Sequence, residues 1–171
     1  MSYARNLIIA AKAIQADITD QIGPPEEGLT SERQSVILRS LVRSTRSYVE
    51  RIANQINGAY ENGWYDACAV MIRRMIETLI IECFEKHKIS ERIKNGAGDF
   101  FYLRDLIDKT LEEKSWNLGR NTKQALRKLK DVGDKSAHSR RFIAQRGDIQ
   151  PLLPEIRAAV QELLLLSELK K

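Results

Sequence analysis

The residues with the clearest chemical potential in this sequence are the charged side chains between Arg120 and Arg146. Nine lysines and arginines stand against two aspartates in these 27 residues, so the segment carries a charge of +7 and the rest of the chain about −2. This asymmetry favours an anionic partner, and RNA or DNA is the first candidate, followed by an acidic protein. The alternative is a helix face that is simply solvated. The side chains predicted to contact nucleic acid are Arg120, Lys123, Arg127, Lys128, Lys135, Arg140 and Arg141.

Aromatic side chains are scarce in this basic segment. Phe142 is the one aromatic residue inside it, and Trp116 lies just before it. Proteins that bind single-stranded nucleic acid usually stack the bases on aromatic rings. The segment therefore predicts contacts to phosphates without sequence preference and gives no support to the stacking of bases.

His138 lies inside the same segment, after a glycine-containing stretch that is predicted to end a helix. Histidine is the side chain best suited to accept a proton near neutral pH. RNA cleavage without a metal needs such a base for the 2′-hydroxyl and a cation to stabilise the charged phosphorane. Lys130, Lys135, Arg140 and Arg141 are close to His138 in the sequence. His138 is thus either a catalytic base or a structural residue that hydrogen-bonds across the fold.

The sequence lacks the motifs of several common catalytic and cofactor sites. It contains no GxSxG motif of a serine hydrolase and no Walker phosphate loop, and residues 96–98 form a lone GxG that no predicted strand precedes. His87 and His138 lie at unrelated places, so they do not form a metal-ligand pattern. Glu82 and Glu85 lie one helical turn apart, but no Glu-x-x-His motif exists to complete a di-metal site. We therefore expect no metal and no cofactor.

The element expected to organise the structure is a helix from Trp64 to Phe84. Its apolar residues recur at steps of three and four, and further apolar residues leave little of the circumference polar, which is typical of a helix inside a bundle. Arg73 and Arg74 both lie within one turn of Glu77, so we expect ion pairs there. If the chain is a binding module, Arg73 and Glu77 would be a buried pair that fixes the packing.

The remaining chain also shows helical periodicity, and no segment alternates with period two for long enough to predict a strand. A kink is expected in the polar run from Arg43 to Ser47, and Asp99 is placed to cap a helix. The fold class is therefore all-α, a bundle of five or six helices. Further helices are predicted at residues 3–21, at 32–61 as one long helix or two in line, at 100–114, at 121–137 and from Asp148 to near the end of the chain.

The clearest linker in the chain follows the first predicted helix. Gly23-Pro24-Pro25 ends that helix, and the linker extends to Gly28. This divides the chain into an N-terminal arm at residues 1–28 and a helical bundle domain at residues 29–171. The arm is expected to dock on a partner protein as readily as on its own domain.

The cysteines and the apolar segments bear on the compartment. Cys68 and Cys83 lie fifteen residues apart on the predicted central helix, about 22 Å along its axis, which excludes a disulfide between them. Both are expected to be buried thiols of a reducing compartment. No stretch approaches the roughly 20 apolar residues of a membrane span. We expect a cytoplasmic protein that makes no membrane contact.

Two segments carry a resemblance to a known group of proteins. The stretch NGAYENGWYDACAVMIRRMIETLIIECF and the later stretch KDVGDKSAH at residues 130–138 resemble an uncharacterised bacterial domain family of the HEPN (higher eukaryotes and prokaryotes nucleotide-binding) group. That family occurs alone and as an appendage on restriction-enzyme subunits and other defence proteins. The resemblance covers about residues 50 to 168 and includes Arg73-Arg74 with Glu77, and Gly133 with Ala137-His138.

The resemblance implies a core of four or five helices that commonly forms a homodimer. Active members are metal-independent endoribonucleases whose motif is an arginine, then four to six intervening residues of which the first is polar, and then a histidine. His138 matches the histidine, but Asp131, Val132 and Gly133 occupy the positions where the arginine belongs. Lys130 is the nearest cation, with Asp131 in the polar position, and a lysine does not hold a phosphate with two parallel bonds as arginine does.

Two interpretations follow from these observations. The first is a non-catalytic or degenerate HEPN-like module that dimerises and binds nucleic acid or a partner protein through its basic edge, in a bacterial defence or restriction setting. The second is a metal-independent endoribonuclease in which His138 is the base, Lys130 or a partner's arginine holds the phosphate, and Asp131 orients the reacting groups. A third, a binder of small nucleotides in the same cleft, has no ligand that the sequence identifies.

Overall fold

The computed structural model describes residues 6–14 and 35–170. The described part is helical throughout, with one isolated bridge between Lys94 and Phe100 and no strand, which confirms the predicted all-α class. Residues 6–14 are helical, within the range predicted for the first helix, and the linker at residues 24–28 lies outside the described residues. The later elements are α2 (Arg39–Val42), α3 (Ser47–Glu61), α4 (Tyr65–Lys86), η1 (Ser90–Ile93), α5 (Leu103–Glu112), α6 (Arg120–His138), α7 (Arg146–Ile149), η2 (Gln150–Leu152) and α8 (Leu153–Leu166).

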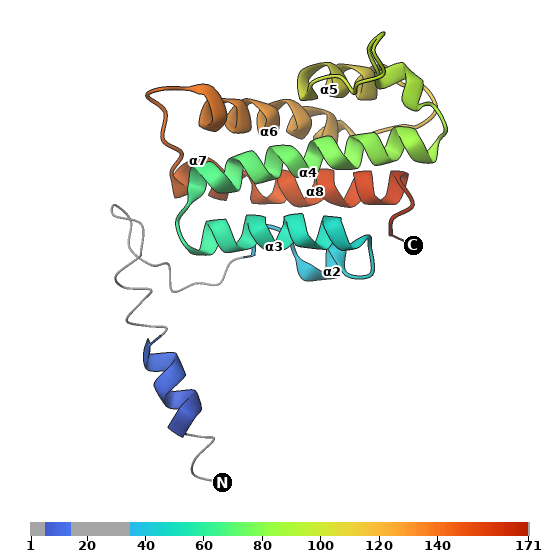
Figure 1. Ribbon diagram of the computed structural model, residues 1–171. Coiled ribbons are helices and arrows are strands. Elements are labelled where there is room, and N and C mark those ends of the chain that lie inside the picture. Colours follow the sequence, from blue (N-terminus) through green and yellow to red (C-terminus); the bar gives the residue numbers. More distant parts are fainter. Residues whose placement is uncertain (1–5, 15–34, 171) are drawn as a thin grey trace.

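The central helix of the bundle is α4, as the sequence predicts. It packs against α3, α5, α6 and α8, and in Figure 1 it lies between α6 (orange) and α3 (cyan). Cys68, Met75, Leu79 and Cys83 are fully buried along it, because apolar side chains recur on nearly every face. Both cysteines are free, and burial raises the pKa of each thiol to about 12.

The segment at residues 32–61, predicted as one long helix or two in line, forms two helices. Residues 35–38 are not helical, α2 is a single turn, and α3 begins only at Ser47. The predicted kink is therefore a complete break, at Arg43 to Arg46. Ser44 lies there in the left-handed region with φ 67°, and its backbone N–H donates to Glu50 of α3 at 2.9 Å. This bond holds the turn that redirects the chain.

The helix predicted at residues 100–114 is shorter, and Asp99 does not cap it. The first helical residue of α5 is Leu103, and Tyr102 precedes it in an extended conformation without a side-chain cap. The backbone N–H of Phe101 donates to the carbonyl of Ile93 at 2.9 Å, which keeps the chain extended at that point. Asp99 belongs instead to a turn in which its N–H donates to the Asn95 side chain at 2.9 Å.

The single helix predicted from Asp148 onward is also divided, into part of α7, η2 and α8. The last helix does not start at Asp148, which lies in α7 and forms a capping box with Gln145. Pro151 falls in η2, and α8 begins at Leu153 with Pro154 in its first turn, where a proline leaves no helical hydrogen bond unmade. Among the described residues, no helix has the length and apolar character needed to cross a membrane.

Candidate nucleic-acid interface

The helix α6 presents one face to the core and the opposite face to solvent. Ala125, Leu126, Leu129 and Gly133 are buried against the bundle, at the helical spacing. All seven basic side chains predicted to contact nucleic acid are exposed, on the outer side of α6 or in the segment that follows it. Figure 1 shows α6 at the side of the bundle away from α3, and among the described helices it packs against α4, α5 and α8.

Most cations of the basic segment have no acidic partner in the described part of the chain. Lys128 pairs with Glu155 of α8 at 3.6 Å, Lys130 pairs with Asp134, and Arg146 bonds the Tyr60 hydroxyl at 3.4 Å. The remaining six form no ion pair with described residues, and we call them the basic face. These are Arg120, Lys123, Arg127, Lys135, Arg140 and Arg141.

A chain of four charges crosses the contact between α4 and α6. Arg73 of α4 donates from Nε to Asp134 of α6 at 2.9 Å and lies 3.6 Å from Glu77, and Lys130 donates to the other Asp134 oxygen at 2.5 Å. The expected Arg73–Glu77 ion pair forms, but it is not buried, because the two side chains are 24% and 32% exposed. Arg74 is exposed and forms no ion pair with a described residue.

Asp134 is the centre of this network, and the sequence reasoning missed it. Burial alone would raise the pKa of Asp134, but hydrogen bonds from Lys130 and Arg73 hold it below its usual value. The ionised carboxylate therefore joins the two helices. The sequence feature that could have identified Asp134 is its spacing of four residues from Lys130, which is the spacing of helical ion pairs.

Gly133 sets how closely α6 approaches α4. A Cβ atom at this position would lie 2.7 Å from Cβ of Arg73 and 3.2 Å from the carbonyl oxygen of Ala69. Only glycine permits this contact. The two segments that carry the HEPN resemblance thus meet at one place, where Arg73 of the first crosses Gly133 of the second.

The three residues of the ribonuclease hypothesis are not brought together within one chain. Lys130 is directed to Asp134, Asp131 is exposed and 3.7 Å from Lys130, and His138 is the exposed last residue of α6. Lys130 and His138 are eight residues apart, about 12 Å along the helix axis. The proposed hydrogen bond from His138 across the bundle does not form with any described residue, and His138 is exposed.

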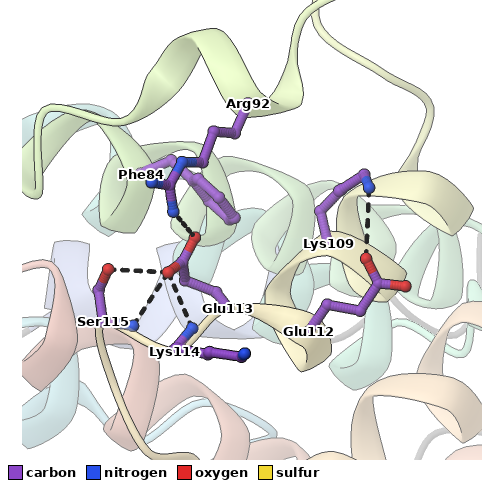
Figure 2. A pocket seen from close by; sticks show the side chains of 7 residues that line it. All are labelled: Phe84, Arg92, Lys109, Glu112, Glu113, Lys114 and Ser115. Carbon is purple, nitrogen blue, oxygen red and sulfur yellow. Dashed lines mark hydrogen bonds and ion pairs between the residues drawn. The ribbon is translucent and has the colours of Figure 1, made fainter.

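A surface hollow of about 710 Å³ lies at the opposite end of the bundle, between η1 and the connection from α5 to α6. Figure 2 shows that its charged side chains face one another: Arg92 donates to Glu113 at 2.7 Å and Lys109 donates to Glu112 at 3.2 Å. Glu113 also accepts from the Ser115 hydroxyl at 2.8 Å. These side chains already have partners, so the hollow offers little free charge for a ligand.

Glu113 is the most strongly held carboxylate of this hollow. Burial alone would raise its pKa, but hydrogen bonds from Ser115, from Arg92 and from the backbone of Lys114 lower it to about 2. The group stabilises the chain where it leaves α5 for α6. It therefore supports the position of α6 and has no evident catalytic task.

A third polar cluster joins the start of α3 to α4. Glu82, expected to be an exposed or salt-bridged carboxylate, is 8% exposed, pairs with Arg46 at 3.0 Å and accepts a hydrogen bond from the Tyr48 hydroxyl. Burial, together with the bond to Glu82, raises the pKa of Tyr48 to about 12. Such a high pKa keeps the phenol protonated as a donor, so the cluster is structural.

Neither a metal site among the described residues nor a similar known protein indicates a function for this chain. Among the described residues, no group of three or more His, Cys, Asp or Glu side chains is placed to hold a metal ion. Comparisons with family models, curated proteins and solved structures found no significant match to this chain. The HEPN resemblance therefore stays a prediction.

Proposed function

We propose that this chain is a non-catalytic helical module that binds nucleic acid through the basic face of α6. The observation that carries the proposal is the set of six exposed cations without an acidic partner among the described residues. Cations that already pair with carboxylates would have to break those pairs to bind phosphate. The cations of the basic face have no such ion pairs to break.

The spacing of these cations suits a polyphosphate. Arg120 and Lys135 are fifteen residues apart on one helix, which spans about 22 Å. A nucleic-acid strand presents a regular line of negative charges over that length, and each contacted phosphate releases bound counterions. The binding free energy then comes from many similar contacts, with little dependence on base sequence.

The proposal is tested by measuring how binding depends on salt. Fluorescence anisotropy with labelled 20-nucleotide DNA and RNA should give an affinity that falls steeply between 50 and 200 mM NaCl. Engagement of all six cations predicts a slope of about −4 in log affinity against log salt. Arg127→Gln should weaken binding severalfold at low salt and make the slope shallower by about 0.7.

Arg51→Gln is the matched control for this experiment. Arg51 is an exposed arginine of α3 without an ion pair to described residues, on the other side of α4 from α6 (Figure 1). The substitution removes the same charge, so a general effect of net charge would weaken binding equally in both variants. Equal losses, or binding that does not respond to salt, would contradict an interface on α6.

A homodimer is the second part of the proposal. Its support is the helix at residues 6–14, where Leu7, Ile8, Ile9 and Ile14 are each 57–60% exposed. Four large apolar side chains on so short a helix favour burial against a second surface, such as another copy of the chain. Sedimentation of the free protein in the binding buffer measures its mass directly. A monomer at all concentrations would contradict the proposed homodimer.

A metal-independent ribonuclease is the alternative function. The observation in its favour is that His138 is exposed in the same stretch as Arg140 and Arg141. Against it, Lys130 is engaged by Asp134 and lies away from His138 along α6. We expect that neither the purified wild-type protein nor His138→Ala cleaves single-stranded RNA in EDTA. Cleavage by the wild type that disappears in the variant would instead establish the ribonuclease.

A further inference from the structure

Trp64 is an exposed tryptophan in the turn between α3 and α4. Its side chain is 52% exposed, whereas Trp116, the other tryptophan, is 9% exposed and packs against Phe84 and His87. A tryptophan buries more apolar area than most side chains, so one that stays half-exposed is available to a ligand. The sequence reasoning assigned Trp64 to the core helix and gave it no role.

The fold brings this turn to the end of the basic face. The backbone N–H of Ala144 donates to Asp66 at 2.9 Å, and Arg146 donates to the Tyr60 hydroxyl at 3.4 Å. These two bonds fasten the segment after α6 to both sides of the α3–α4 turn. Figure 1 shows the end of α6, α7 and the start of α4 at this same end of the bundle.

Arg140 and Arg141 lie four and three residues before Ala144, and both are exposed and without an acidic partner among described residues. The acids here are mostly engaged: Asp66 accepts from Ala144, and Asp148 accepts from the Gln145 backbone at 2.9 Å. Glu61 is exposed at the end of α3. An indole ring at the same end of the bundle as two arginines combines a stacking surface with phosphate contacts.

We propose that Trp64 stacks on a base of a single-stranded nucleic acid whose phosphates lie along the basic face. This inference rests on the proposed function. A single strand exposes the flat faces of its bases, whereas a duplex buries them between neighbouring pairs. Stacking on an aromatic ring adds affinity for any base and is therefore tolerant of sequence. The interface should prefer single-stranded DNA or RNA over a duplex of the same length.

The test uses the intrinsic fluorescence of the full chain. Titration with (dT)20 or (U)20 should quench the solvent-exposed part of the tryptophan emission, because the base covers Trp64. Trp64→Leu should remove this quenching and weaken binding of the single strand by roughly tenfold. Trp64→Phe keeps a ring and should retain part of the affinity. Duplex binding should change little in either variant.

Tyr102→Ala is the matched control. Tyr102 is 82% exposed and precedes α5, and the neighbouring Phe101 backbone bonds Ile93 in η1, at the other end of the bundle (Figure 1). The variant removes an exposed aromatic ring at the end of the bundle opposite Trp64, and single-strand binding should not change. Unfolding by urea checks that every variant is folded.

Each outcome separates this inference from the function on which it rests. Salt-dependent binding without quenching, and unchanged affinity in Trp64→Leu, would overturn the stacking inference and leave the basic face intact. No salt-dependent binding by the wild type would reject the nucleic-acid function and the inference with it. A preference for RNA over DNA with equal quenching would identify RNA as the natural strand.

Discussion

At the scale of single residues, Gly133 has the clearest structural role. It lies in the middle of α6, where glycine costs about 1 kcal/mol relative to alanine. That cost is offset at the contact with α4, because a methyl group there would lie 2.7 Å from Cβ of Arg73. The glycine allows α6 to approach until Arg73 reaches Asp134.

Gly133→Ala should therefore destabilise the protein, although alanine is the better helix former. Overpacking of this kind costs about 1–3 kcal/mol, so we expect a net loss of roughly 1 kcal/mol in the free energy of unfolding. Gly58→Ala is the control, because Gly58 lies inside α3 with no atom within 4 Å of a new Cβ. It should stabilise by up to about 1 kcal/mol. Urea unfolding of both variants measures whether each substitution raises or lowers the free energy of unfolding. A Gly133→Ala variant more stable than the wild type would contradict the close contact between α6 and α4.

At the scale of elements, the connection from α5 to α6 depends on a carboxylate held by hydrogen bonds. Glu113 follows the last residue of α5, and its side chain is only 6% exposed. Arg92 from η1 and Ser115 from the connection both donate to it (Figure 2). The bonds lower its pKa from 4.5 to about 2.

The lowered pKa predicts how stability depends on pH. A carboxyl group with a lower pKa in the folded state contributes its full stabilisation above the unfolded value of 4.5 and loses it as the pH falls towards 2. Glu113→Gln should cost about 1–3 kcal/mol at pH 7 and reduce the loss of stability between pH 4.5 and pH 2.

Glu112→Gln serves as the control for this pH dependence. Its carboxylate pairs with Lys109 at 3.2 Å, but its side chain is 68% exposed. An exposed pair of this kind contributes at most about 1 kcal/mol. The wild type and Glu112→Gln should show the same acid unfolding curve, measured by circular dichroism. A Glu113→Gln curve that coincides with them would show that Glu113 does not hold the connection.

At the scale of the whole molecule, the helices and the core follow from the sequence to different degrees. The all-α class, the central position of α4 and the burial of Cys68 and Cys83 were predicted, because apolar periodicity is a local signal of a buried helix. The ends of helices were predicted less well. Asp99 does not cap α5, because the backbone bond from Phe101 to Ile93 competes with the local capping preference.

The candidate interface, too, could be predicted from the sequence only in part. The charge of the Arg120–Arg146 segment is a property of composition, and the helical period places its apolar residues on one side, so exposure of the basic side chains could be predicted. The pairing of Lys130 with Asp134 had a local signal in their spacing of four residues, but the bond from Arg73 to Asp134 had none, because Arg73 is far away in the sequence.

The sequence by itself thus determined an all-helical chain with a central apolar helix and a basic segment, since periodicity and charge are local properties. Tertiary structure alone decided which cations stay unpaired, how closely α6 meets α4, and that Trp64 shares an end of the bundle with Arg140 and Arg141. The physical reason is that each of these depends on contacts between segments about 60 to 80 residues apart, such as Arg73 with Asp134 and Asp66 with Ala144. Only packing of the helices creates such contacts.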